Sequence, residues 1–160
     1  MTSANQLRIV VGIDGSQQSL VALGWALREA ASLDALIEVV HCWQPHGVTD
    51  VLFGSPDELH RGSMCMLQNE VNAALATLPA SAAHPPVLQT SCPGRAANIL
   101  ADRASGAHLL VLGAHGRTDA RDLAFGRVAA SCLRHAGCPV VIVENEHTII
   151  RHQASTTATA

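Results

Sequence analysis

Five short apolar segments alternate with stretches of helical periodicity, and no other feature of the sequence constrains the fold as strongly. Between the first two segments, Leu20, Leu23 and Leu27 recur at the spacing of one helix face. Almost continuously apolar strands that are joined by helices form parallel sheets covered on both faces. We therefore predict a single α/β domain, a five-stranded parallel sheet with helices on both faces. The predicted strands are residues 7–13, 35–42, 87–92, 108–112 and 139–143.

Length and the first residues of the chain give expectations for domain count and location. A chain of 160 residues is long enough for one domain with a substantial core. We expect that domain to cover residues 1–146, and residues 147–160, which end in STTATA, to form a flexible tail. The first eight residues lack the basic and apolar parts of a signal peptide, and no apolar run approaches the roughly 20 residues of a membrane span. These features predict a cytoplasmic protein with no membrane partner.

Charge and residue usage exclude several classes of function. The formal net charge is −3, all 10 basic residues are arginine, and aromatic residues make up 2% of the chain, so we expect no nucleic-acid partner. Without lysine the chain cannot contain a Walker A loop. No set of residues suited to nucleophilic catalysis stands at the ends of the predicted strands, so we predict no catalytic residue. The five cysteines form no CxxC pair, and His41, Cys42 and His46 lack a fourth partner, so we predict no metal site.

A loop rich in glycine and arginine separates the fourth predicted strand from the helix that follows it. Gly113, Gly116 and Gly126 stand at fixed offsets, and residues 117–134 include four arginines. Glycine lets the main chain approach a ligand closely, and a helix start offers unpaired N–H groups and a partial positive charge to an anion. We expect the helix to begin near Gly126, with its first N–H groups at residues 126–128. The loop is either a phosphate-binding site or an ordinary flexible connection.

Two polar residues near the ends of predicted strands each allow two interpretations. Asp14 follows the first strand, where it lies beside a phosphate-bound magnesium ion or serves only to begin the next helix, for which Ser16 is the expected N-cap. His115 lies in the glycine loop, where it contacts ribose or phosphate or is an exposed loop residue without a ligand. Open α/β sheets bind ligands beyond the carboxyl ends of their strands, where the winding direction reverses. The loops after the first and fourth strands are therefore the predicted ligand-binding edge.

Over nearly its whole length, residues 8–143, the chain resembles the universal stress protein family. The opening IVVGIDGSQQSLVALGWALREA is similar to the first strand, turn and helix of that family, and GCPVVIV is similar to its closing strand. Nucleotide-binding members have the motif G-x2-G-x9-G-(S/T) after the fourth strand, and Gly113, Gly116 and Gly126 match its spacing. The resemblance implies a Rossmann-like fold similar to that of the adenine nucleotide alpha hydrolases. It is closest to the nucleotide-binding branch, with a modified motif, because Arg127 stands where the family has Ser or Thr.

The resemblance also implies which residues contact the nucleotide. Asp14 matches the aspartate beside the nucleotide, and Cys42 matches a position that contacts adenine, usually through its backbone. Gly113 and Gly116 match the glycines around the ribose and phosphates. Gly126 and Val128 match the start of the phosphate-binding helix. The predicted nucleotide-binding residues are Asp14, Cys42, Gly113, His115, Gly116, Arg117, Gly126, Arg127 and Val128.

Arg127 has two opposite interpretations. Its guanidinium carries a permanent charge and a bidentate set of donors, which suits a phosphate at least as well as a hydroxyl does. It is also long enough to fill the phosphate site. The first interpretation predicts nucleotide binding, and the second predicts a site that has lost its ligand.

The expected function is binding of an adenine nucleotide, ATP first among them and with or without magnesium, by a dimeric stress-response or regulatory protein. The resemblance implies that the last strand, PVVIV from Pro139 to Val143, pairs with its copy in a homodimer, and an apolar edge strand needs covering. Two alternatives remain open. One is an interaction protein of the same fold that binds no nucleotide, and the other is a slow ATPase, for which no general base is evident.

Overall fold

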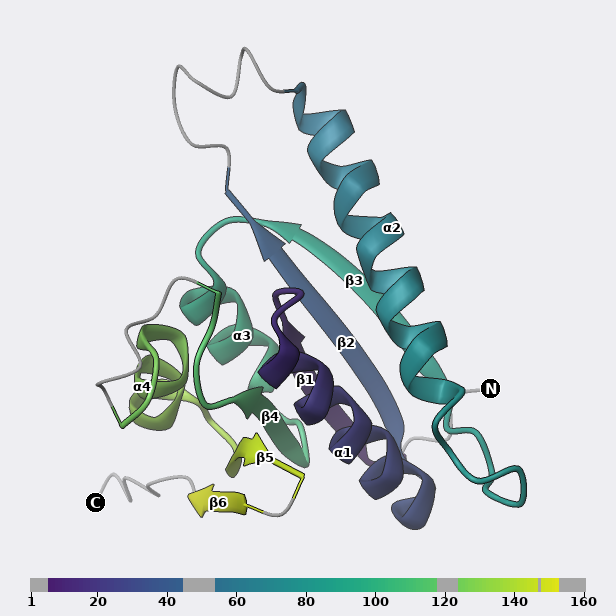
Figure 1. The fold of residues 1–160 in the computed structure, drawn as a ribbon. Helices are drawn as coiled ribbons and strands as arrows, with labels where there is room; N and C mark the ends of the chain where they lie inside the picture. The colour runs from purple at the N-terminus through teal and green to yellow at the C-terminus, as the bar shows by residue number, and fades with distance from the viewer. Residues whose placement is uncertain (1–5, 45–53, 118–123, 147, 153–160) are drawn as a thin grey trace.

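The computed structural model describes residues 6–44, 54–117, 124–146 and 148–152. They form one sheet with the strand order β3-β2-β1-β4-β5-β6 (Figure 1). Strands β1 to β5 run parallel, which confirms the predicted five-stranded parallel sheet. The strands are β1 (Arg8–Ile13), β2 (Leu36–Trp43), β3 (Val87–Pro93), β4 (Leu109–Gly113), β5 (Val140–Asn145) and β6 (Thr148–His152).

Strand β6 is a departure from the sequence-based prediction. It runs antiparallel to β5, with a shift in register between Val143 and Asn145. The expectation of a flexible tail from residue 147 is therefore wrong for residues 148–152, and residues 153–160 lie outside the described part of the chain. The physical reason is local, because Thr148, Ile149 and Ile150 are three consecutive β-branched residues with high strand propensity.

The same strand changes the edge of the sheet. Strand β5 pairs with β4 on one side and with β6 on the other. The family resemblance implies that residues 139–143 pair with a second copy of the chain. In this structure β6 already occupies that edge, so pairing of two copies through β5 requires β6 to leave it.

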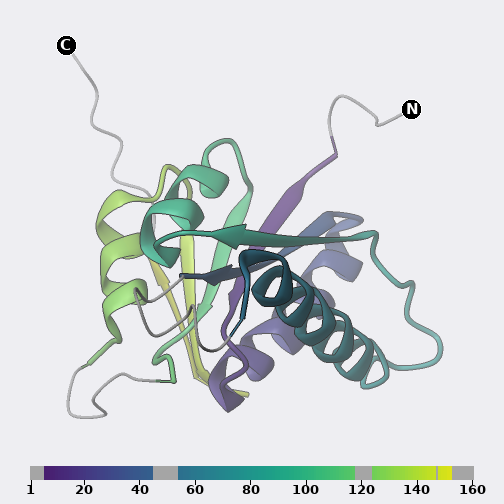
Figure 2. The same ribbon diagram turned by 90° about the horizontal axis from the view of Figure 1, so that it is seen from above.

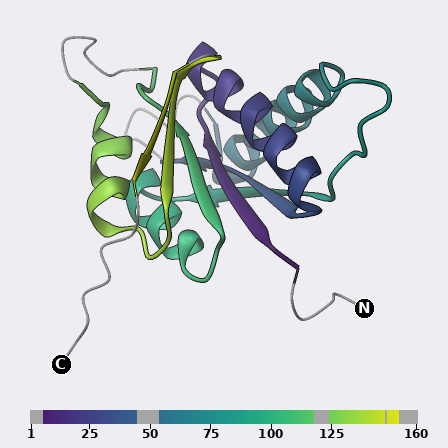
Figure 3. The same ribbon diagram turned by 90° about the horizontal axis from the view of Figure 1, so that it is seen from below.

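Within the described residues, four helices cover the two faces of the sheet. Helices α1 (Gln17–Leu33) and α2 (Pro56–Leu75) lie on one face, and α3 (Ala96–Ala104) and α4 (Arg127–His135) lie on the other (Figures 2 and 3). Each face has its own hydrophobic core, as expected for a sheet that is apolar on both sides. The core under α1 and α2 includes Ile9, Val11, Leu23, Leu27 and Val39, and the core under α3 and α4 includes Val10, Val40, Leu110 and Ile142.

Side-chain caps fix where the first two helices begin. The Ser16 hydroxyl accepts the N–H of Ser19 at 3.2 Å, which confirms the predicted N-cap of α1. Ser55 caps α2 in a capping box, in which Glu58 accepts the Ser55 N–H at 2.6 Å. Pro56 then stands in the first turn, where its missing N–H has no cost.

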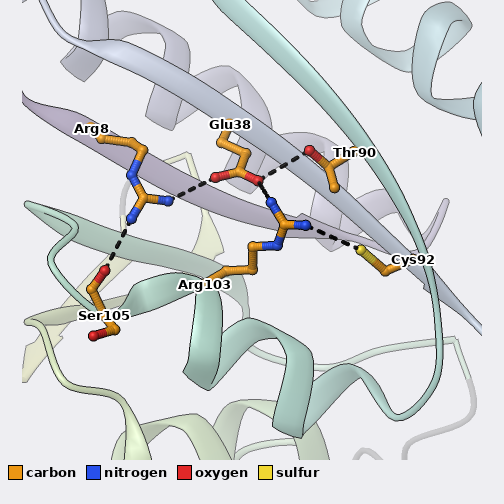
Figure 4. A network of polar contacts seen from close by, with 6 residues as sticks. All are labelled: Arg8, Glu38, Thr90, Cys92, Arg103 and Ser105. Atoms are coloured by element: carbon orange, nitrogen blue, oxygen red, sulfur yellow. Dashed lines mark hydrogen bonds and ion pairs between the residues drawn. The ribbon is translucent and has the colours of Figure 1, made fainter.

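A buried carboxylate joins three strands to α3. Glu38 on β2 is 2% exposed, and its Oε2 accepts from Arg8 at 2.7 Å (Figure 4). Its Oε1 accepts from Arg103 of α3 and, at 3.1 Å, from the Thr90 hydroxyl of β3. Arg103 also contacts the sulfur of Cys92 (Figure 4). Both carboxylate oxygens are therefore paired, as a buried charge requires.

Candidate nucleotide-binding site

The connections after β1 and β4 leave the sheet toward opposite faces. Strand β1 leads into α1 on one face, whereas the neighbouring strand β4 leads toward α4 on the other. A crevice therefore opens beyond the carboxyl ends of these two strands, where open α/β sheets bind ligands. Two adjoining cavities lie in this crevice, and they share the lining residues Asp14, Cys42, Ala96, Gly116 and Val128.

The inner cavity is small and mainly apolar. Its volume is about 80 Å³, and its walls include Val40, Leu100, Leu112 and Ala129. Burial raises the pKa of the Cys42 thiol, which also lines this cavity, to about 12. Cys42 is therefore a neutral thiol at physiological pH, and Asp14 is the one carboxylate among the described residues that line the inner cavity.

The outer cavity is an open, charged groove of about 840 Å³. The ends of β1 and β2 contribute Asp14 and His41, and the segment between β4 and α4 contributes Arg117 and Arg127. Residues 94–98, at the start of α3, complete the lining. Arg117, Arg127 and Arg95 are all exposed, so the described lining of the groove includes three cationic side chains.

Asp14 joins the two loops that border the crevice. Its Oδ1 accepts the N–H of Ser16 at 3.0 Å, and its Oδ2 accepts the N–H of Arg117 at 2.9 Å. Burial raises the pKa of this carboxyl, but the hydrogen bonds from Ser16, Arg117 and Ser19 together lower it by more. The pKa of Asp14 therefore lies below its ordinary value of 3.8. Asp14 is therefore ionised, and each of its oxygens already holds a main-chain N–H.

Gly113 is set by close packing against α1. A Cβ at this position would lie 3.0 Å from the carbonyl carbon of Gln18 and 3.1 Å from the nitrogen of Ser19. The Gln18 side chain also accepts the N–H of His115 at 2.7 Å. The half-buried His115 lines the inner cavity, so the glycine loop is fastened to α1 on the side away from the groove.

The start of α4 differs in one respect from the sequence-based expectation. Gly126 is the N-cap residue, and its N–H donates to the carbonyl of Ala114 at 2.7 Å. This N–H is engaged within the protein, contrary to the expectation that it faces a phosphate. Arg127 and Val128, the first two residues of α4, line the outer groove, and Val128 also lines the inner cavity.

The structure brings most of the predicted site residues together. Eight of the nine line one or both cavities, and Gly126 lies behind them. Of the other two arginines in residues 117–134, Arg134 lies in the last turn of α4 and lines neither cavity, and Arg121 lies outside the described residues. The eight predicted residues that line a cavity are Asp14, Cys42, Gly113, His115, Gly116, Arg117, Arg127 and Val128.

Sequence reasoning missed His41 and the start of α3. Burial lowers the pKa of His41, the charge of Asp14 opposes this, and Arg117 lowers the pKa further, so His41 is a neutral ring in the groove. The dipeptide Pro93-Gly94 between a strand and a helix was the available signal for the α3 contribution.

Within the described ranges, no three His, Cys, Asp or Glu side chains gather as a metal site would require. Across the same residues, no helix has the length and apolar character that crossing a membrane requires.

Fold and crevice define an open, doubly wound α/β protein with a groove at the point where the winding reverses, the place where proteins of this class bind ligands. Residues 7–144 match the model of the universal stress protein family. The chain belongs to this family, as the motif spacing implied.

Curated relatives and solved structures agree with this assignment. Universal stress protein Rv2623 of Mycobacterium tuberculosis (strain H37Rv) is 31% identical over 156 residues, covering 95% of this chain and 52% of the relative. The chain thus spans about half the length of the curated relatives it matches. The structure of UspA from Lactobacillus plantarum has a TM-score of 0.72 at 19% identity, covering 89% of this chain and 100% of that one. A universal stress protein in complex with cAMP has a TM-score of 0.67 at 24% identity, covering 89% and 99%.

Proposed function

We propose that the crevice binds an adenine nucleotide, ATP foremost, and that the chain acts in the cytoplasm as a nucleotide-binding regulatory protein of the stress response. The observation that supports this most directly is the pairing of two different cavities at one crevice. The inner one is mainly apolar, and the outer one is open and bordered by Arg117 and Arg127. A nucleotide has the same two parts, a flat base with apolar faces and a chain of anionic phosphates.

The position of Arg127 supports binding over loss of the ligand. Arg127 is exposed and lines the outer groove, whereas the lining of the inner cavity does not include it. The base therefore has a cavity that this side chain does not fill, and the guanidinium stands where phosphates would extend. A charge-assisted contact from arginine to phosphate is among the stronger hydrogen bonds in proteins.

The family assignment gives independent support. A universal stress protein of the same fold has been solved in complex with cAMP, which contains adenine, ribose and one phosphate. Asp14 is the one carboxylate among the described residues that line the outer groove, and both of its oxygens already accept main-chain N–H groups. We therefore expect magnesium to make little difference to binding.

The first test is the nucleotide content of the protein as purified. The chain is prepared without added nucleotide and denatured, and the released adenine nucleotides are measured by chromatography; an empty preparation is titrated with ATP by calorimetry. Bound or titrated ATP near one equivalent per chain, without turnover, is the expected result. A folded chain that neither retains nor binds ATP contradicts the proposal and favours an interaction protein. Steady release of ADP favours a slow ATPase.

Arg127 is the residue whose substitution separates a phosphate contact from a blocked site. We expect Arg127→Ala to weaken ATP binding by about 1.5–3 kcal/mol, the value of a hydrogen bond to a charged group. Calorimetric titration measures the change. Arg134→Ala is the matched control, because Arg134 is an exposed arginine in the last turn of the same helix, and we expect it to bind ATP as the unmodified chain does. Tighter binding by Arg127→Ser would overturn the phosphate contact.

A further inference from the structure

A continuous chain of hydrogen bonds runs from the outer groove to the surface of α2. His41 Nδ1 lies 2.7 Å from the hydroxyl of Ser63, which lies 2.6 Å from the hydroxyl of Ser91. Ser91 in turn lies 3.1 Å from Nδ1 of the exposed His60 and accepts the indole N–H of Trp43 at 2.9 Å. These hydrogen bonds thus connect β2, β3 and α2. They lie on the face of the sheet opposite to the Glu38 network, the contacts of Glu38 with Arg8, Thr90 and Arg103.

The fold explains why these side chains meet. His41 and Ser91 are direct neighbours in the parallel ladder between β2 and β3, so their side chains emerge on the same face. Ser63 lies on the buried side of α2, which covers that face, and is 4% exposed. His60 precedes Ser63 by three residues, which places both on one side of the helix.

Two arrangements keep every hydroxyl hydrogen within this series of hydrogen bonds. Each serine hydroxyl has one hydrogen to donate, and a neutral histidine has one N–H. In the first arrangement His60 donates to Ser91, Ser91 to Ser63 and Ser63 to His41, so the proton of His41 is on Nε2. In the second, every bond runs the other way and the proton of His41 is on Nδ1.

The environment of His41 favours the first arrangement. His41 lines the outer groove, and no described residue bonds its Nε2. The charged groups that act on its ring are Asp14, at the end of β1, and Arg117, in the segment after β4. Because Nδ1 faces Ser63, Nε2 is the ring nitrogen that is left for the groove. Asp14 acts on the ring more strongly than Arg117 does, so the net charge around the ring favours a proton on Nε2.

The geometry points to His41 as a further ligand-contacting residue, which donates a hydrogen bond through Nε2 to an oxygen or ring nitrogen of the bound nucleotide. This inference rests on the proposed function. Ser63 and Ser91 are positioning residues, because they hold Nδ1 as an acceptor and thereby keep the donor on the groove side. The Nε2–H of His41 thus adds a neutral donor beside the charged donors of Arg117 and Arg127.

The protonated ring nitrogen of His41 can be determined without any ligand. Two-bond ¹H–¹⁵N correlation spectra of the labelled chain distinguish the Nε2–H form from the Nδ1–H form. We expect the Nε2–H form, and we expect the Nδ1 resonance to move in Ser63→Ala, which removes its donor. A His41 proton on Nδ1, or a Nδ1 resonance that is unchanged in Ser63→Ala, overturns the arrangement.

Two substitutions of His41 then test which ring nitrogen contacts the nucleotide. The amide of glutamine extends about as far as Nε2, whereas the amide of asparagine extends only about as far as Nδ1. We expect His41→Asn to weaken ATP binding roughly three- to tenfold, the value of one hydrogen bond, and His41→Gln to lose much less. His84→Asn is the control, because His84 is exposed and precedes the amino end of β3, whereas the groove lies beyond the carboxyl ends of the strands.

The outcomes distinguish this inference from the proposed function. If the unmodified chain binds ATP and both substitutions at His41 reduce affinity equally, or neither does, the contact is wrong while the nucleotide site stands. If the unmodified chain does not bind ATP, the proposed function fails and the contact fails with it, whereas the spectra still decide which nitrogen is protonated. Thermal unfolding of all variants shows whether a loss of affinity follows from a loss of fold.

Discussion

At Gly113 the main chain of α1 limits the side chain to a hydrogen atom. The distances of 3.0 to 3.1 Å from a built Cβ to Gln18 and Ser19 involve main-chain atoms, which cannot rotate away. A glycine in a ligand-binding motif thus has a structural cause here that is separate from room for the ligand. Gly113 is therefore both the first glycine of the motif and the residue that allows α1 to pack closely against β4.

We expect Gly113→Ala to reduce the free energy of unfolding by about 1–3 kcal/mol, the usual cost of forcing an extra carbon into a packed site. Urea-induced unfolding measures the difference. The matched control is Gly62→Ala, because Gly62 lies within α2 and a Cβ there meets no atom within 4 Å. That variant should gain about 0.5–1 kcal/mol, since alanine restricts the unfolded chain more than glycine does. Equal stability of Gly113→Ala and the unmodified chain would contradict the packing argument.

At the scale of elements, the Glu38 network substitutes for a hydrophobic contact between β2, β3 and α3. Removing both arginines leaves the carboxylate buried and without a countercharge, whereas removing the carboxylate leaves arginines that are 27% and 40% exposed and can turn to water. We therefore expect Arg8→Ala/Arg103→Ala to lose about 3–5 kcal/mol of unfolding free energy, and Glu38→Met to lose clearly less. The comparison is made by urea unfolding at neutral pH, and the reverse order would contradict this account.

Local sequence patterns predicted strands β1 to β5 but not which elements lie side by side in the sheet. The predicted strand at residues 108–112 corresponds to β4 at Leu109–Gly113, because a short apolar run between turn residues has few alternatives. His41 and the start of α3 join the site because β2 lies beside β1 and α3 crosses from β3 to β4, and strand order is a property of the whole sheet. Strand β6 was missed because Thr148, Ile149 and Ile150 are too short a run to stand out in a polar tail.

At the scale of the whole molecule, β6 decides whether the sheet has a free apolar edge. A chain that ends after Glu146 lacks β6 and exposes the unpaired main-chain groups of β5. We expect this truncated chain to form dimers in a concentration-dependent manner, because a second copy can then pair with β5. Sedimentation velocity over a range of concentrations measures the change.

Truncation after His152 is the control for this experiment, because it keeps β6 and removes only residues that follow it. We expect it to sediment as the full-length chain does. A truncation after Glu146 that leaves the sedimentation unchanged, whether the chain is monomeric or already dimeric, would show that β6 does not compete with a partner for the β5 edge.

The bridge that Asp14 makes between two loops determines how the crevice responds to pH. Its carboxylate joins residues that are 103 positions apart in the sequence, and it loses its charge only at a pH below its ordinary pKa of 3.8. Acidification therefore weakens this joint only as the pH falls through that lowered value, and His41, whose pKa is also lowered, stays neutral over a wider range as well. The joint between the two loops and the neutral state of the His41 ring therefore both persist when the surrounding solution is moderately acidified.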